Sequence, residues 1–176
     1  GDPVVDCAAA TAISSNGQVA GHSGAFGSID LISFAYANGT FTELVGFPGT
    51  SPPLQLITIA FGINDGGLVV GTTFQDTGTL VSDNAFIYDD GSWTDLGPGA
   101  AYAINAIGEV TGKSQALPDE EFGPLGPARA FIFSNGSMKD LGTLNGHSTS
   151  SGHAINASGQ VVGSSEASGA SARRAF

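Results

Sequence analysis

One nine-residue motif occurs four times along this chain, and this repetition constrains the fold more than any other feature. Each copy has Ile, three turn residues, Gly, any residue, Val, any residue and a second Gly. The copies begin 50, 41 and 51 residues apart, and periods in this range are typical of propeller blades and similar arrays. The chain therefore consists of about four similar units. The copies occupy residues 13–21, 63–71, 104–112 and 155–163.

A second motif alternates with the first and carries aromatic residues. It has Phe, any residue, a second aromatic residue, two residues, Gly, three residues, an acid and Leu, at residues 34–44, 86–96 and 131–141. Phe176 begins a fourth copy. Successive residues of a strand point to opposite faces, so Phe86 and Tyr88 share one face and Ile87 lies on the other. Because both faces are apolar, we expect this strand to be covered on both sides, as stacked sheets provide.

Each motif predicts a β-hairpin, because Asn and Gly in the short polar segments favour tight turns between strands. Two hairpins give four strands per repeat, which is the size of one propeller blade. We therefore predict an all-β fold of antiparallel four-stranded repeats within one domain that spans residues 1–176. The expected hairpins lie near residues 10–22 and 31–45, 59–74 and 84–97, 101–114 and 128–142, and 152–164 and 172–176.

The two ends of the chain suggest how the array closes. The last repeat has only the opening strand of its second hairpin, at 172–176, and residues 3–8 resemble the closing strand of the other repeats. We expect a four-bladed propeller in which residues 3–8 complete the last blade, within one chain or between chains in a head-to-tail array. The alternative is a fragment of a larger propeller. A β-trefoil is excluded, because it has three repeats.

Charge and cysteine content exclude several functions. Five basic residues stand against 16 acidic residues, giving a net charge of −11, which argues against binding to the phosphates of nucleic acids. The single cysteine, Cys7, excludes an internal disulfide framework. It aligns with leucines of the other repeats, so we expect a small buried residue there. No apolar run approaches the roughly 18 residues of a membrane helix, so we expect no membrane insertion.

One acidic residue recurs at the same position of each repeat, and these acids are the candidate metal ligands. Carboxylates at Glu43, Asp95 and Asp140, with Asp6 as a fourth, could bind Ca²⁺ if a ring brought them together. The alternative, which we favour, is that each carboxylate caps a turn or pairs locally. On that reading the protein has no cofactor.

The segments between hairpins vary, and such segments on a repeated scaffold commonly carry recognition. The candidate ligand-binding residues are the acids Asp119, Glu120 and Glu121, and also His147 and His153, which flank a Ser/Thr-rich segment. The sequence has no spacing typical of a catalytic serine, a zinc protease or a phosphate-binding loop. We therefore predict a protein that is not an enzyme. A sugar-active propeller enzyme is an alternative that would need the three clustered acids in one pocket.

The second motif, followed by the first, resembles the extracellular repeat family named HAF after its His-Ala-Phe triplet, most closely over residues 129–165. The chain departs at the triplet itself, where Asn or Arg precedes Ala-Phe at residues 84–86, 129–131 and 174–176. The resemblance implies a bacterial, secreted or cell-surface protein of β-repeat architecture, without a shared reaction.

Together these observations predict an extracellular or cell-surface binding module whose variable loops hold a glycan or a protein. The protein would be a monomer or a head-to-tail homo-oligomer. The alternative is a structural subunit of an extracellular fibre or surface layer, assembled by strand donation between chains.

Overall fold

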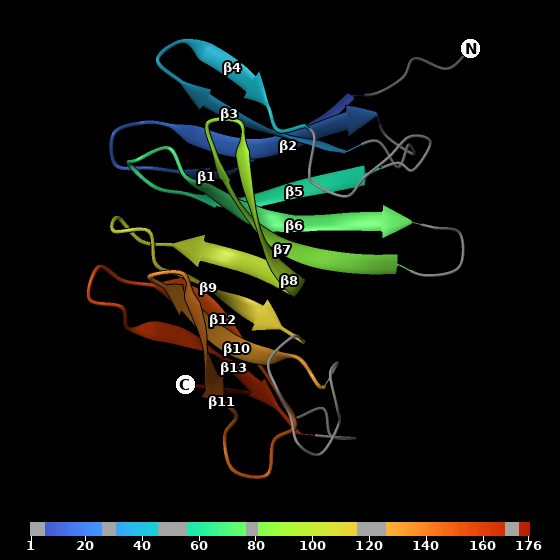
Figure 1. The fold of residues 1–176 in the computed structure, drawn as a ribbon, viewed down its shortest axis with the longest axis vertical. Helices are drawn as coiled ribbons and strands as arrows, with labels where there is room; N and C mark the ends of the chain where they lie inside the picture. Colours follow the sequence, from blue (N-terminus) through green and yellow to red (C-terminus); the bar gives the residue numbers. More distant parts are fainter. Residues whose placement is uncertain (1–5, 26–30, 46–55, 77–80, 116–125, 168–172) are drawn as a thin grey trace.

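The computed structural model describes residues 6–25, 31–45, 56–76, 81–115, 126–167 and 173–176. These residues form strands and turns without a helix (Figure 1), and accordingly none of them belongs to a helix that could cross a membrane. All strand pairs are antiparallel, so the prediction of an all-β, antiparallel fold is confirmed. The strands are β1 (Asp6–Ile13), β2 (Val19–Ala25), β3 (Ile32–Ala37), β4 (Thr40–Glu43), β5 (Leu56–Ile63), β6 (Val69–Asp76), β7 (Val81–Asp89), β8 (Ser92–Ile104), β9 (Val110–Ser114), β10 (Arg129–Ser134), β11 (Ser137–Gly142), β12 (Thr149–Ile155), β13 (Val161–Glu166) and β14 (Arg173–Ala175).

The strands form three sheets that correspond to four repeat units. The first unit is the four-stranded sheet β1-β2-β3-β4, and the last is the three-stranded sheet β12-β13-β14. Between them lies a seven-stranded sheet, because the long strand β8 pairs with β7 through its first half and with β9 through its second half. Gly97 and Gly99 lie at this change of partner with φ of 81° and 144°, values that glycine adopts without strain. Strand β8 is therefore shared by the second unit, β5 to β8, and the third, β8 to β11.

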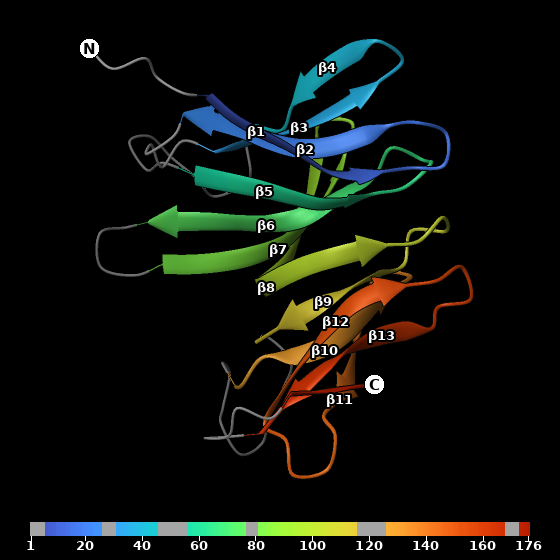
Figure 2. The same cartoon turned by 180° about the vertical axis from the view of Figure 1, so that it is seen from behind.

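The first unit lies at one end of the long axis, the second follows it, and the third and fourth units lie together at the other end (Figures 1 and 2). The described residues form no closed barrel or propeller. The expectation that residues 3–8 complete the last unit of the same chain is wrong for the part that is described, because Asp6 and Cys7 pair with β2 in the first sheet. Closing this short hairpin costs less chain entropy than joining the two ends of the chain. Residues 1–5 and the side chain of Cys7 lie outside the described part.

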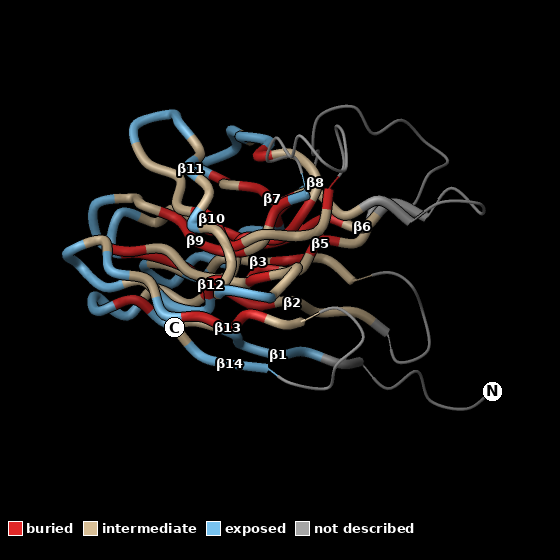
Figure 3. Tube along the Cα trace, turned by 90° about the horizontal axis from the view of Figure 1, so that it is seen from below, coloured by how far each residue is buried: buried red, intermediate tan, exposed pale blue. Residues whose placement is uncertain are grey.

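The core consists of two apolar clusters, each between neighbouring units. Adjacent residues of β6 serve both clusters: Val69 packs toward the first unit and Val70 toward the third. This follows from the alternation of side chains along a strand. Buried residues accordingly lie in the middle of the strands, whereas β1 and β14 are largely exposed (Figure 3). The clusters comprise Ala20, Leu44, Ala60, Ile63, Val69, Phe86 and Tyr88, and Val70, Ala85, Leu96, Ala101, Val110 and Phe131.

A β-bulge recurs in the first strand of every unit. The register against the second strand shifts by one residue in β1, β5, β8 and β12. Such a bulge leaves one extra residue unpaired and re-aims its side chain. The second glycine of the repeat motif lies beside each bulge, close against the backbone of the first strand. The extra residues are Thr11, Phe61, Tyr102 and His153.

Candidate functional site

The four bulge residues come from first strands that pack side by side, because β1 contacts β5, β5 contacts β8 and β8 contacts β12. The Phe61 and Tyr102 rings meet edge to face with centroids 5.3 Å apart. The Tyr102 and His153 rings are stacked at 6.3 Å with an interplanar angle of 26°. At the start of the row, the Thr11 hydroxyl donates to the Ala60 carbonyl at 2.7 Å. We call Phe61, Tyr102 and His153 the aromatic row.

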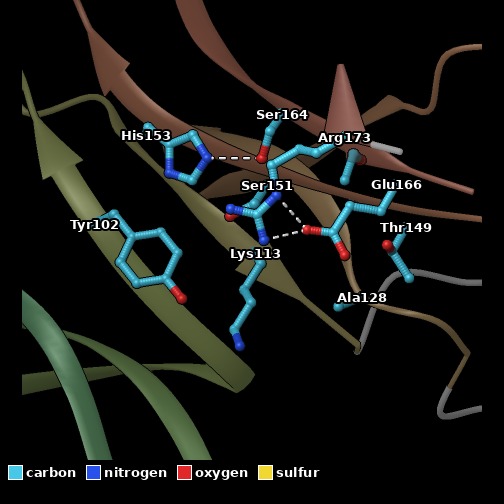
Figure 4. Close-up of a pocket in the computed structure, with 10 residues that line it drawn as sticks. Tyr102, Lys113, Ala128, Thr149, Ser151, His153, Ser164, Glu166 and Arg173 are labelled. Carbon is cyan, nitrogen blue, oxygen red and sulfur yellow. Dashed lines mark hydrogen bonds and ion pairs between the residues drawn. The ribbon is translucent and has the colours of Figure 1, made fainter. Parts of the chain in front are cut away.

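A hollow of about 300 Å³ lies at the His153 end of the aromatic row, between the third and fourth units (Figure 4). Its walls come from strands β8, β9, β12, β13 and β14 and from the segment before β10, so neither unit forms it alone. Hydroxyl groups and three charged side chains line it beside the two rings. The lining residues are Tyr102, Lys113, Ala128, Thr149, Ser150, Ser151, His153, Ser164, Glu166 and Arg173.

Two pairs of polar side chains in the hollow hold each other in position. The Nε2 atom of His153 lies 2.8 Å from the Ser164 hydroxyl, and Arg173 pairs with the Glu166 carboxylate opposite it in the sheet. Tyr102 and His153 lie on one side of the hollow and Glu166 on the other (Figure 4). The hollow therefore offers aromatic surface and several hydrogen-bonding groups within one concave site.

The contact between His153 and Ser164 has the spacing of a general base and a nucleophile, but the surroundings do not complete a catalytic site. A triad needs an acid that orients the imidazole. Glu166 is engaged with Arg173, and no carboxylate within the described ranges hydrogen-bonds to His153. The arrangement is suited to holding a ligand through hydrogen bonds.

The recurring acids lie in three successive sheet units and act locally. Glu43 is exposed in β4. Asp95 accepts hydrogen bonds from the Asn84 amide at 3.1 Å and from the Gly97 N–H at 2.8 Å. Asp140 accepts from the Gly142 N–H at 2.6 Å and from Arg129 at 3.3 Å.

The structure does not bring these acids together. No group of three or more His, Cys, Asp or Glu side chains in the described part of the chain is placed to hold a metal ion. The fourth acid of the set, Asp6, lies in β1 of the first sheet and has no described side chain.

The predicted ligand-binding residues do not all lie at the hollow. His153 lines the hollow. His147 lies outside it, in the turn before β12, where its N–H donates to the Leu144 carbonyl at 2.9 Å. Asp119, Glu120 and Glu121 lie outside the described residues.

The sequence offers Tyr102 as an aromatic residue that could stack on a sugar, but sequence reasoning missed Phe61 and did not group Tyr102 with His153. A signal for them exists, because Thr11, Phe61, Tyr102 and His153 each stand two residues before the Ile of the first motif. Alignment of the copies therefore places these four residues in one column, but the sequence does not reveal that each of them is the extra residue of a bulge.

The fold and the site define a β-repeat protein with stacked antiparallel units and a row of bulge residues along their first strands. Comparisons with protein-family models, with curated proteins and with solved structures found no match to this chain.

Proposed function

We propose that this protein is a secreted or cell-surface binding module, without catalytic activity, that holds a glycan along the aromatic row and in the adjoining hollow. The observation that carries this proposal is the continuity of the Phe61, Tyr102 and His153 rings with a polar hollow at one end. Ring faces accept the apolar C–H faces of sugars, and hydroxyl and charged groups hydrogen-bond to sugar hydroxyls. Binding of this kind needs no metal and no cofactor.

The shape of the site favours a glycan over a protein ligand. Each unit adds one bulge residue to a line, and an extended sugar chain presents one similar ring after another. The hollow is concave and has few apolar groups other than the two rings. A protein interface would instead need a larger surface with an apolar centre.

The proposal includes an architecture and a location. We propose that the units are blades of a propeller-type array, since each complete unit has four antiparallel strands and the first three units pack on one another through apolar clusters. The resemblance to HAF repeats supports an extracellular location. The net charge of −11 supports a partner other than nucleic acid.

Glycan-array screening of the 176-residue chain, followed by calorimetric titration of the best oligosaccharide, tests the proposal. Tyr102→Ala should weaken binding about tenfold, since loss of a ring stack of roughly 1.4 kcal/mol has that effect. Tyr102→Phe keeps the ring and should retain most of the affinity. Ile107→Ala, at a 73% exposed residue in the β8–β9 turn of the same unit, is the control.

Two outcomes would contradict the glycan site. One is the absence of any glycan that binds at millimolar concentration. The other is a bound glycan whose affinity is equally unaffected by Tyr102→Ala and by Ile107→Ala, which would place the ligand elsewhere on the molecule. Circular dichroism of each variant establishes that the fold is retained.

A further inference from the structure

Apolar side chains that are buried in the second unit, one of the inner units, are exposed on the outer side of the first unit. Ile13 is 70% exposed, whereas its counterpart Ile63 is 7% exposed against the first unit. Tyr36 is 44% exposed and its counterpart Tyr88 is 7% exposed. The inner residues are covered because a preceding unit packs on them. We call Ile13, Tyr36 and the 52% exposed Phe41 the first face.

The outer side of the last unit shows the same difference. Val162 is 58% exposed. The residues at this position in the other units, Ala20, Val70 and Thr111, are fully buried against the unit that follows each of them. The outer side of the last unit, marked by Val162 and Asn156, is the last face. It is the surface that elsewhere in this molecule receives the next unit.

A ladder of asparagine side chains joins the motif turns of successive units. The Asn64 amide donates to the Asn105 carbonyl at 3.1 Å, and the Asn105 amide donates to the Asn156 carbonyl at 3.0 Å. At the last face, the Asn156 amide donates to Gln160 within its own turn. At the first face, the Ser14 carbonyl accepts from Gly17, as the Asn105 carbonyl accepts from Gly108 beside its ladder bond. The last face thus presents the donor of the next ladder bond and the first face the acceptor.

Charge is also distributed unevenly between the two ends. Residues 1–45 contain four acids and no Lys or Arg. Residues 143–176 contain one acid, Glu166, and two arginines, Arg173 and Arg174, which are both exposed. By sequence, residues 1–45 are therefore negative and residues 143–176 slightly positive, a difference that favours contact between unlike segments over contact between like ones.

From these observations we propose that the last face of one chain binds the first face of a second copy, so that the protein assembles head to tail. The new interface repeats the packing already present between neighbouring units: Val162 meets Ile13 and its aromatic neighbours, and the Asn156 amide donates to the Ser14 carbonyl. The two faces differ, so the contact is heterologous and gives a ring if the rotation closes and a filament if it does not.

This assembly is independent of the proposed glycan site and uses a different contact from strand donation. The hydrogen-bonded strands of each copy stay within that copy, and only the apolar end faces and the ladder join the two. The aromatic row would then continue from His153 of one copy toward Thr11 of the next. An assembly would offer a longer track than one chain.

Light scattering over a concentration series tests the proposal on the 176-residue chain. The average mass should rise above 17.6 kDa with concentration. Ile13→Asp blocks the first face and Val162→Asp blocks the last face, and each variant alone should remain a monomer. Because each retains one intact face, an equal mixture should form dimers of one copy of each. Ile107→Asp, at a residue of comparable exposure to Ile13, should assemble like the unaltered chain.

Three results would overturn the proposal. The first is an unaltered chain that stays at 17.6 kDa at every concentration. The second is a mixture of the two blocked variants that gives no dimer although the unaltered chain assembles. The third is a blocked variant that dimerises by itself, which would show a symmetric contact between two like faces. Since both altered residues are more than half exposed, the variants should fold normally, as circular dichroism can verify.

Discussion

At the scale of single residues, the second position of the repeat motif that is always glycine has no room for a larger side chain. A Cβ atom on Gly71 would lie 2.1 Å from the Ile59 carbonyl oxygen and 2.8 Å from the Phe86 ring. Because the nearest atom belongs to the backbone of β5 and not to the end of a flexible side chain, Gly71→Ala should destabilise the protein by about 3 kcal/mol or more. Gly17→Ala is the control, because its Cβ would meet nothing within 4 Å at a φ of 86° and should cost about 1–2 kcal/mol. Urea unfolding measures both, and equal losses would contradict the steric explanation.

Another residue-scale feature joins the first two units through Asp65. The pKa of Asp65 lies below its ordinary value of 3.8, first because the Ser15 hydroxyl donates to the carboxylate and further because backbone N–H groups of Asn16 and Ser15 do so. A lowered folded pKa means that the carboxylate stabilises the fold above the ordinary value, and that this contribution is lost as pH falls through the folded pKa. Ser15→Ala should raise the pKa of Asp65 toward 3.8. Titration of the carboxyl carbon by NMR measures this, and an unchanged pKa would contradict it.

At the scale of strands and turns, the local sequence was sufficient to predict where the hairpin turns lie. The turns of the second motif need positive φ at two adjacent positions, and Asn38 and Gly39 adopt φ of 53° and 79°, as a type I′ hairpin requires. Asn-Gly and Asp-Gly pairs therefore predicted where the chain reverses. The bulges could not be predicted, because an extra residue in one strand depends on its register with the next. The aromatic row, which depends on the bulges, was missed for the same reason.

Within one chain, the predicted pairing of the N-terminal strand was wrong for its described residues, for a different physical reason. Residues 3–8 do resemble the closing strands in sequence. This similarity shows only that such residues suit a strand at the edge of a sheet, and it does not show which strand they pair with. Which strands pair depends on loop entropy, and β1 joins β2 across a turn of five residues. A short alignment contains no information about that cost.

A prediction at the scale of strands and turns concerns the asparagine ladder. Asn105→Asp keeps the side-chain oxygen that accepts from the Glu109 N–H but removes the amide that donates to the next unit and to the Glu109 carboxylate. Since Asn105 is 5% exposed, we expect a loss of about 1–3 kcal/mol in the free energy of unfolding. Asn156→Asp removes an exposed hydrogen bond within one turn, and we expect it to lower the free energy of unfolding by only a few tenths of the loss from Asn105→Asp. Chemical denaturation of the two variants measures the difference, and equal costs would mean that the ladder adds nothing between units.

At the scale of the whole molecule, each unit is stabilised by its neighbours. Each apolar cluster joins residues of two neighbouring units, and the ladder runs from unit to unit. Stability of such an array is close to a sum of unit and interface contributions. The same interfaces position the site, because the hollow exists only where the third and fourth units meet. A substitution that weakens this interface would therefore reduce both the stability of the fold and the affinity for the ligand, even when the altered residue does not touch the ligand.

One pair of substitutions distinguishes the stability that comes from contacts between units from the stability that comes from contacts within a unit. Val70 and Val162 occupy the same position of the motif, but Val70 is fully buried between the second and third units and Val162 is 58% exposed. Val70→Ala removes two methyl groups from a closed interface and should cost about 2 kcal/mol. Val162→Ala should cost under about 0.5 kcal/mol in dilute monomer and should weaken head-to-tail assembly at high concentration. Urea unfolding at low concentration measures both free energies. An equal loss from the two substitutions would mean that the valine stabilises its own unit, and that the contact between units contributes little at this position.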